Sequence, residues 1–426
     1  MVRRSFVEKL IIRGGRPLSG DVYISGMKNS ALPVIFGTIA AGDVCTIGNI
    51  PDVSDISLAF DILRSIGAKV RFINTDTAII DTTNVVRKSP PMEYVSKMRA
   101  STYLLGAMLG RFGEAQVGYP GGCDFGTRPI NQHLKGFELL GAKVAYGGDG
   151  NINVTASEGL NGNFIYFDIA SVGSTINVML AAVFAEGTTV IENAAREPHI
   201  VDTASFLNAC GADISGAGTS MIRIRGVKKL HGCTYDLAPD MIEAGTYMAA
   251  AAATYGNVTV RHIIPKHMEA VTVKLREIGL DLDVGDDYIT VRSKQGYRGT
   301  EIQTNPYPGF PTDMHPQFTA MLCLSQGIST ITERVWNGRF RYVDELVKMG
   351  ADITIDEGSA IINGISGFKG ATVKASDLRA GACLVIAGLA AYGETTVTGV
   401  EWIDRGYESL VDKLRALGAD IQRVEF

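Results

Sequence analysis

A glycine-centred pattern recurs six times along this 426-residue chain, and it constrains the fold more than any other feature. In each copy, an apolar stretch with helical spacing ends at a glycine and continues into strand-forming residues. The six glycines lie 68 to 74 residues apart and are Gly67, Gly141, Gly211, Gly279, Gly350 and Gly418. A steady period of this size predicts a fold built from repeated supersecondary units.

A second glycine precedes each of these by 23 to 28 residues and also stands before strand-forming residues, many of them β-branched. This second set is Gly42, Gly113, Gly187, Gly256, Gly327 and Gly393. Glycine is suited to the end of a helix because it enters the left-handed conformation without a Cβ clash. Each repeat is therefore predicted to run as helix, strand, helix and then further strands.

The apolar patterning indicates which helices are buried. Segments 246–253 and 382–387 lack a polar face, and a helix that is apolar all round lies in a core. Two other helices have one apolar face, formed by Leu410, Val411, Leu414 and Leu417 in one and by Val343, Leu346 and Val347 in the other. Buried helices beneath strands favour the α/β class. We expect a two-domain inside-out α/β barrel of six internal repeats, with helices inside and sheets outside.

Two turn-like segments indicate where the domains meet. A chain this long exceeds what one ordinary core accommodates. Segment 237–240 lies between the third and fourth repeats, and segment 25–28 follows the first strands. If the chain passes between domains at both places, residues 1–27 join 239–426 in one domain. Residues 28–238 then form the other domain, and each domain has three repeats.

Charge and cysteine usage exclude several classes of protein. The net charge of −5 gives no reason to expect nucleic acid or an anionic membrane as a partner. No signal peptide or membrane-spanning run is evident, so we expect a cytoplasmic protein. The cysteines form no CxxC pair, which is typical of reduced thiols and not of a disulfide framework or zinc site. They are Cys45, Cys123, Cys210, Cys233, Cys323 and Cys383.

Segment 119–129 has the most unusual composition in the chain, because glycines and prolines surround Cys123 and Arg128. It could be a surface turn with an incidental cysteine, since most free cysteines behave as small apolar residues. It could also present a thiol whose pKa is tuned by a nearby cation, so that it acts as an acid or nucleophile. Composition alone leaves both interpretations open.

Several charged residues are candidates for binding an anion or moving a proton. Lys28 stands at the start of a predicted helix, where anions bind favourably. Arg99, Arg379 and Arg405 each precede small residues, and arginine is the best bidentate ligand for carboxylate and phosphate. Asp313 could cap a helix or act as a base. The histidines have no metal-ligand spacing and no nucleotide-binding glycine motif is present, so we expect neither metal nor cofactor.

Together these segments resemble the UDP-N-acetylglucosamine 1-carboxyvinyltransferases, the enolpyruvyl transferases that open peptidoglycan synthesis. The resemblance covers essentially the whole chain. It rests on segments 25–29, 97–101, 120–123, 128–129, 171–173, 195–198, 310–314, 377–380 and 404–408. The related 5-enolpyruvylshikimate 3-phosphate synthases lack the loop that contains Cys123.

The resemblance implies two domains that close around phosphoenolpyruvate and UDP-N-acetylglucosamine, and transfer to the sugar 3-hydroxyl with release of phosphate. Cys123 would protonate the vinyl carbon and react with fosfomycin, and Asp313 would take the proton of the hydroxyl. The implied catalytic residues are Cys123, Asp313, Lys28 and Arg405. The implied substrate-binding residues are Asn29, Arg99, Arg128, Pro129, Asn131, Ser171, Val172, Gly173, Glu197, Arg339, Asp377 and Arg379.

Four positions depart from the family pattern. Asn131 stands where the family usually has an aspartate that contacts uracil, and Gln132 where an apolar residue is common. Ile169 replaces a frequently basic residue, and His315 follows the candidate base where glutamine is usual. Three alternatives therefore remain: the same chemistry on another acceptor, a non-catalytic binding or regulatory duplicate, and a structural repeat scaffold. Retention of Cys123 argues against the last two.

Overall fold

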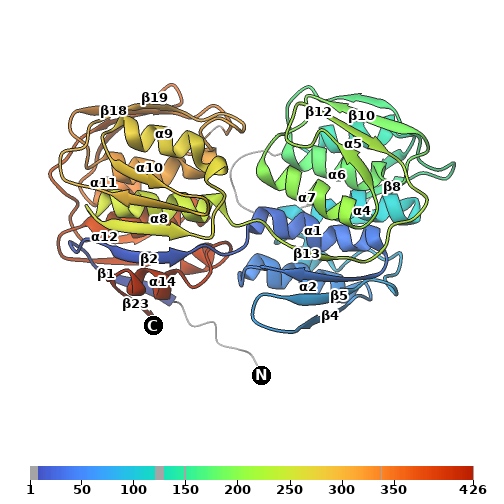
Figure 1. Ribbon diagram of the computed structural model, residues 1–426, viewed down its shortest axis with the longest axis horizontal. Helices are drawn as coiled ribbons and strands as arrows, with labels where there is room; N and C mark the ends of the chain where they lie inside the picture. The colour runs from blue at the N-terminus through green and yellow to red at the C-terminus, as the bar shows by residue number, and fades with distance from the viewer. Residues whose placement is uncertain (1–7, 120–128, 148–149, 337, 426) are drawn as a thin grey trace. The chain divides into compact units, whose positions relative to one another are not determined.

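The structure is a computed structural model that describes residues 8–119, 129–147, 150–336 and 338–425, and its fold is mixed α/β. The chain divides into two compact units, each built from strands and helices (Figure 1). Unit 1 combines Met1–Ser25 with Pro239–Phe426, and unit 2 is Gly26–Ala238.

Within the described residues, unit 1 contains three four-stranded sheets with one shared pairing scheme. In each sheet the first pair of strands is parallel and the next two pairs are antiparallel. The orders are β21 (Thr372–Lys374), β22 (Glu394–Thr398), β1 (Glu8–Arg13), β23 (Asp420–Glu425); then β2 (Ser19–Tyr23), β14 (Asn257–Arg261), β16 (Tyr288–Arg292), β15 (Asp281–Val284); then β17 (Glu301–Gln303), β18 (Ile328–Thr332), β20 (Ser359–Asn363), β19 (Asp352–Asp356).

Unit 2 repeats this scheme in two of its described sheets, and the third has the two antiparallel pairs alone. The orders are β9 (Phe164–Tyr166), β10 (Thr188–Glu192), β12 (Met221–Arg225), β11 (Asp213–Ser215); then β13 (Thr234–Asp236), β3 (Val44–Gly48), β5 (Ala78–Asp81), β4 (Lys69–Phe72); then β6 (Glu114–Gly118), β8 (Asn151–Thr155), β7 (Lys143–Tyr146).

Three helices pack against one another at the centre of each unit (Figure 1). In unit 1 these are α8 (Met241–Ala253), α10 (His315–Leu322) and α12 (Leu378–Ala390), and every residue of α8 is buried. In unit 2 they are α1 (Lys28–Ala41), α4 (Tyr103–Phe112) and α6 (Val172–Ala182). Burial of whole helices confirms the prediction that segments 246–253 and 382–387 lie in a core.

The remaining helices are shorter or have an exposed face. They are α2 (Ser54–Ser65), α3 (Met92–Val95), α5 (Asn131–Leu139), α7 (Pro198–Ala209), α9 (Glu269–Glu277), α11 (Val343–Lys348), α13 (Val400–Ile403) and α14 (Leu410–Ala416), with the 3₁₀ turns η1 (Arg99–Thr102), η2 (Pro265–Met268) and η3 (Thr312–Met314). The prediction for the apolar face of α11 was wrong at one position, because Val347 is 48% exposed. Val343 and Leu346 are buried, whereas Val347 lies about 100° around the helix from Leu346 and faces solvent.

The repeated glycines adopt the predicted conformation almost everywhere. All six of the first set have φ between +92° and +105°, so each one ends its helix in the left-handed region. The exception is Gly256 in the second set, because the left-handed residue there is Tyr255, with φ of 54°. Gly256 instead allows close approach, since a Cβ at this position would lie 2.3 Å from the carbonyl oxygen of Leu18.

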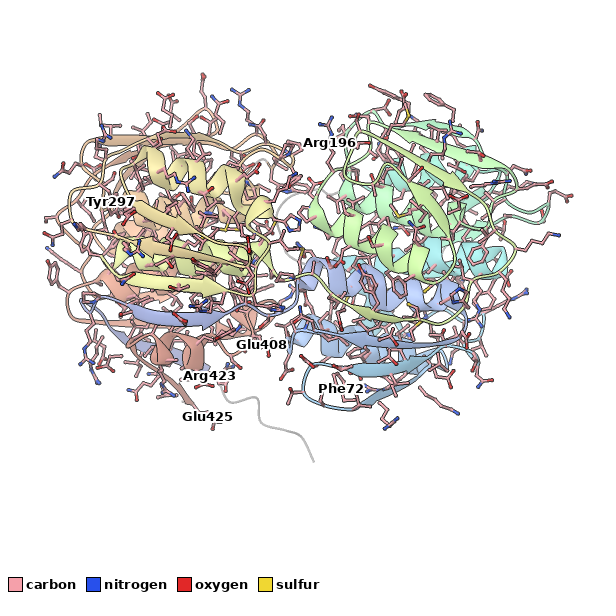
Figure 2. The ribbon with its side chains drawn as sticks, in the orientation of Figure 1. Phe72, Arg196, Tyr297, Glu408, Arg423 and Glu425 are labelled. Atoms are coloured by element: carbon pink, nitrogen blue, oxygen red, sulfur yellow. The ribbon has the colours of Figure 1, made fainter. Side chains whose placement is uncertain are left out.

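Aromatic contacts tie the outer helices to the sheets. Phe72, at the end of β4, packs edge-on against Phe60 of α2, with ring centroids 5.5 Å apart (Figure 2). The buried Tyr297, also labelled in Figure 2, donates its hydroxyl hydrogen to the carbonyl oxygen of Met321, at 2.6 Å.

Candidate active site

Unit 1 holds a carboxylate between two guanidinium groups. Asp313 lies on the 3₁₀ turn η3, immediately before the buried helix α10. Its Oδ1 accepts a hydrogen bond from Nη2 of Arg339 at 2.7 Å. Its Oδ2 accepts from Nη2 and Nε of Arg379 at 3.1 and 3.3 Å. These three residues, all predicted from the sequence, are therefore brought together in one cluster.

The cluster is shielded from water, which strengthens its electrostatics. The side chains of Arg339 and Arg379 are each 5% exposed, whereas that of Asp313 is 31% exposed. Burial opposes ionisation of Asp313, but the charges of Arg379 and Arg339 outweigh it and hold its pKa well below the usual range. Among the described residues, Nη1 of Arg379 is buried without a hydrogen-bond partner. An anion such as carboxylate or phosphate would satisfy that donor.

A buried network holds Arg339 in place. Nη1 of Arg339 donates to Oγ1 of Thr312 at 2.7 Å, and Thr312 in turn donates to Oε2 of Glu333 at 2.8 Å. His315 Nδ1 lies 3.0 Å from the same oxygen. Burial raises the pKa of Glu333, but hydrogen bonds from His315 and Thr304 outweigh it and lower that pKa to about 2. His315 therefore acts here as a buried structural partner of Glu333.

The backbone and an aromatic ring position Arg379. Asp377 caps α12, because its Oδ1 accepts from the backbone N–H groups of Arg379 and Ala380 at 2.8 and 3.0 Å. The Arg379 guanidinium carbon lies 5.5 Å from the ring centroid of Tyr407. The Tyr407 hydroxyl lies 2.8 Å from Oγ1 of Thr246 on α8. Arg379 is therefore fixed from both its backbone and its side chain.

Arg405 also belongs to unit 1 and lies in the turn that follows α13. Its guanidinium carbon is 5.5 Å from the ring centroid of Trp402, a distance typical of a cation–π contact. Arg405 thus contributes a third candidate arginine to this unit.

In unit 2, Lys28 is the first residue of the buried helix α1, and Asn29 follows it. Nζ of Lys28 lies 3.1 Å from Oδ2 of Asp55 on α2, and both side chains are largely buried. Lys28 therefore stands at the start of a helix, where the sequence placed it, and Asp55 holds its side chain; its binding of an anion stays a prediction.

The segment 171–173 forms the start of α6. Oγ of Ser171 accepts a hydrogen bond from the backbone N–H of Ser174 at 3.3 Å, and Val172 and Gly173 form the first turn. A Cβ on Gly173 would lie 2.9 Å from Cε1 of His133. Burial and the charge of Arg99, from η1, lower the pKa of His133 to about 3. No pattern in the sequence indicates that this histidine is buried and neutral.

The departures near Asn131 lie at the start of α5. Asn131 opens the helix after the exposed Pro129 and the buried Ile130. Gln132 donates to Oδ2 of Asp168 at 2.9 Å, and Lys135 lies 2.8 Å from the same oxygen. Ile169, next to this carboxylate, is 71% exposed. Gln132 thus fixes Asp168 next to the exposed Ile169.

Glu197 immediately precedes α7, where Pro198 opens the helix. Its Oε2 accepts a hydrogen bond from the backbone N–H of Arg196 at 2.9 Å, and the exposed Arg196 side chain is labelled in Figure 2. Cys123 and Arg128, the two remaining site predictions, lie outside the described residues.

Comparison with known proteins identifies relatives along the whole chain. A profile of the EPSP synthase (3-phosphoshikimate 1-carboxyvinyltransferase) family matches residues 12–414. UDP-N-acetylglucosamine 1-carboxyvinyltransferase 2 from Clostridium acetobutylicum is 52% identical over 418 residues, covering 98% of this chain and 99% of that protein. UDP-N-acetylglucosamine 1-carboxyvinyltransferase from Clostridium botulinum is 51% identical over 419 residues, covering 98% of this chain and 100% of that protein.

Solved structures agree with this similarity. The enolpyruvyl transferase NikO from Streptomyces tendae superimposes with a TM-score of 0.89 at 27% identity, covering 99% of this chain and 100% of that one. EPSP synthase from Acinetobacter baumannii has a TM-score of 0.75 at 21% identity and covers 98% of this chain, which shows a shared fold. Among the helices of the described residues, none combines the length and apolar character needed to cross a membrane.

Proposed function

The chain belongs to the EPSP synthase family of carboxyvinyltransferases, and from this premise we propose that it is a UDP-N-acetylglucosamine 1-carboxyvinyltransferase. It transfers the enolpyruvyl group of phosphoenolpyruvate to the 3-hydroxyl of UDP-N-acetylglucosamine and releases phosphate. Relatives with that name are about half identical to this chain over nearly its full length. The product is the enolpyruvyl sugar nucleotide used in peptidoglycan synthesis, and the reaction takes place in the cytoplasm.

The observation that carries this proposal is the arrangement around Asp313. A single carboxylate is shared by Arg339 and Arg379, and a buried donor of Arg379 has no partner among the described residues. Phosphoenolpyruvate carries both a carboxylate and a phosphate, and planar guanidinium groups bind such groups in a bidentate manner. Binding of the anion would draw the guanidiniums partly away from Asp313, which would leave the carboxylate free to accept a proton.

The chemistry divides among named residues. Cys123 delivers a proton to the methylene carbon of phosphoenolpyruvate, and the sugar oxygen forms a bond to the adjacent carbon as Asp313 accepts the hydroxyl proton. The tetrahedral adduct then breaks its carbon–oxygen bond to phosphate, which takes the proton held by Asp313, and the Cys123 thiolate takes back a proton from the new methyl group. Lys28 and Arg405, with Arg99 and the substrate-binding Arg128 and Arg379, stabilise the charge on the departing phosphate.

Residues of unit 2 are proposed to hold the nucleotide sugar. Pro129, Asn131 and the start of α6 at Ser171, Val172 and Gly173 would contact the nucleotide, because the N–H groups at a helix start bind phosphate oxygens. Asn29 and Glu197 would contact the sugar, whereas Asp377 would act through Arg379, whose backbone it holds.

We also propose that both units are inside-out barrels of three repeats each. The shared pairing scheme of the described sheets supports this, since five of them have one parallel pair followed by two antiparallel pairs. The buried central helices and the six left-handed glycines support it as well.

The experiment is phosphate release from phosphoenolpyruvate, measured with and without UDP-N-acetylglucosamine. We expect release that depends on the nucleotide sugar in the wild type and that falls by about 100-fold or more in Cys123→Ala, since general acid catalysis contributes roughly 10²–10⁴-fold. A folded wild type that releases no phosphate with this acceptor would refute the proposed function.

The second candidate is the same transfer to a different acceptor. Gln132 and its hydrogen bond to Asp168 favour it, because they lie beside Asn131, one of the residues proposed to contact the nucleotide. Phosphate release measured with a panel of nucleotide sugars and phosphorylated alcohols as acceptors decides between the two candidate functions. Phosphate release with another acceptor, and none with UDP-N-acetylglucosamine, supports the second candidate.

A further inference from the structure

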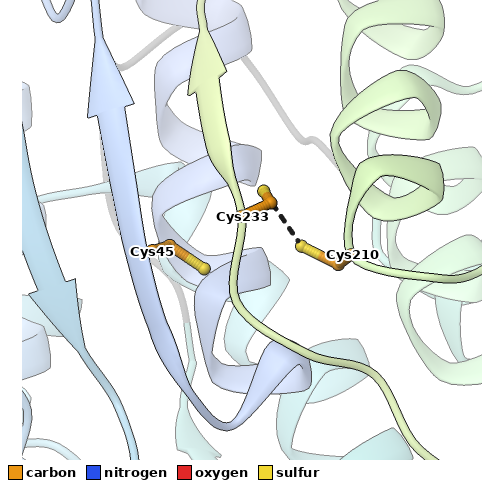
Figure 3. Close-up of side chains that lie close together, drawn as sticks. All are labelled: Cys45, Cys210 and Cys233. Atoms are coloured by element: carbon orange, nitrogen blue, oxygen red, sulfur yellow. Dashed lines mark hydrogen bonds between the residues drawn. The ribbon is translucent and has the colours of Figure 1, made fainter.

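Three cysteines that are far apart in the sequence converge in unit 2. Cys45 lies on β3, Cys210 follows the last residue of α7, and Cys233 directly precedes β13 (Figure 3). Their sulfur atoms all lie within 4.8 Å of one another, and those of Cys210 and Cys233 are 3.3 Å apart. This cluster is separate from every residue assigned to the proposed reaction.

The backbone fixes where these thiols point. The carbonyl oxygen of Cys233 accepts from the N–H of Thr46 at 2.8 Å, which holds Cys233 beside the strand that bears Cys45. The carbonyl oxygen of Cys210 accepts from the N–H of His231 at 2.9 Å, which ties the loop before Cys233 to the end of α7. The backbone therefore holds the three cysteines close to one another.

The spacing suits a metal ion better than a disulfide. Three sulfurs that bind one zinc ion at about 2.3 Å with tetrahedral angles lie roughly 3.8 Å apart. The Cys210–Cys233 separation of 3.3 Å lies below that value, and all three separations stay within 4.8 Å. A disulfide would use two of the sulfurs and leave the third buried beside the bond.

The three cysteines differ in their access to solvent. Cys45 and Cys210 are fully buried, whereas Cys233 is half-buried. Thiolates are the form that binds metal ions, and a half-buried one gives an ion a route from solvent.

We propose that Cys45, Cys210 and Cys233 form a binding site for one thiophilic divalent cation of the zinc class, held by three sulfurs. The ion replaces the thiol protons, which leave to solvent, and the sulfurs keep their oxidation state. Three thiolates around a divalent ion leave one negative charge and a fourth position, which a solvent ligand fills on the side of Cys233. Soft thiolate ligands select ions such as Zn²⁺ and Cd²⁺ over Mg²⁺.

The test uses the full chain, reduced and freed of metal, in a Cys123→Ser background so that the loop thiol contributes no ligand. Cd²⁺ is titrated while the ultraviolet charge-transfer absorption of cadmium thiolates is recorded, and bound Zn²⁺ per chain is measured after desalting. Cys233→Ala and Cys45→Ala remove ligands, and Cys323→Ala, a buried thiol of unit 1, is the matched control. Thermal unfolding of each apo variant checks that it is folded.

We expect one ion per chain in the reference protein and in Cys323→Ala. Affinity should fall by more than 100-fold in Cys233→Ala and in Cys45→Ala, because loss of even an outer partner of a metal ligand costs about 10- to 100-fold. Equal binding by Cys233→Ala and the reference overturns the proposal. The absence of bound metal also overturns the proposal. Loss of free thiols in pairs on mild oxidation, with no metal bound, would identify a disulfide instead. Phosphate release plays no part in this test, so its outcome is independent of the proposed function.

Discussion

Replacing Asp313 with asparagine tests the electrostatic core of the candidate site. The change keeps size and shape but removes the charge that Arg339 and Arg379 share at 2.7 and 3.1 Å. Removing one partner of a buried ion pair costs about 3–5 kcal/mol. Because the Asp313 side chain is 31% exposed and asparagine keeps one acceptor oxygen, we expect the lower end, about 3 kcal/mol.

Thermal unfolding at pH 7 gives the first readout for Asp313→Asn. Each 1 kcal/mol shifts the midpoint by about 2–4 °C in a domain of 150–250 residues, so the transition of unit 1 should fall by about 6–12 °C. Asp344→Asn is the matched control, since this aspartate is exposed in the first turn of α11, and it should shift the midpoint little.

The pH dependence provides the second readout. The native pKa of Asp313 is lower than its unfolded value near 4, so its contribution to stability is present above about pH 4 and is lost as the pH falls further. The difference in free energy of unfolding between the wild type and Asp313→Asn should therefore narrow below about pH 4. A variant as stable as the wild type at pH 7, or a gap that widens in acid, would refute the ion-pair reasoning.

Three further predictions follow from single contacts. Glu333→Gln should lower the free energy of unfolding by roughly 3 kcal/mol at pH 7, because the native pKa of Glu333, about 2, lies below the ordinary value. Chemical denaturation should show this loss shrinking as the pH falls from about 4.5 toward 2. Gly106→Ala should lower the thermal midpoint by at least the equivalent of about 1–3 kcal/mol, since its Cβ would lie 2.2 Å from the carbonyl oxygen of Asn177; an unchanged midpoint contradicts this close packing of α4 on α6. Arg379→Lys should reduce kcat/KM for phosphoenolpyruvate by about 10- to 100-fold in the phosphate-release assay, because lysine cannot reproduce a bidentate contact worth about 1.5–3 kcal/mol. Full activity of this variant would remove Arg379 from the proposed anion site.

The sequence predicted those parts of the fold that depend on local chemistry. The six glycines such as Gly67 and Gly418 end helices because left-handed backbone is cheap only for glycine. Burial of α8 and α12 followed from their lack of a polar face. At Gly256 the same prediction was wrong, because Tyr255 adopts the left-handed conformation instead. Glycine is required at 256 by its close contact with Leu18, which lies more than two hundred residues away in the sequence.

The parts of the site that escaped prediction depend on tertiary contacts. Glu333 carries no sequence signal, yet through Thr312 it holds Arg339 in place. The cysteines of unit 2 were expected to be separate thiols, because Cys45 and Cys210 are far apart along the chain and no ligand spacing joins them. Their convergence arises from the pairing of β13 with β3 and the packing of α7, which residue spacing does not reveal.

The most direct test of the proposed reaction is identification of its product with phosphoenolpyruvate labelled with carbon-13 in the enolpyruvyl group. We predict that all of the label lost from phosphoenolpyruvate appears in an enol ether on the sugar 3-oxygen of UDP-N-acetylglucosamine, with one phosphate released per transfer. Label recovered as pyruvate, or attached to another acceptor while the nucleotide sugar stays unchanged, would contradict the account.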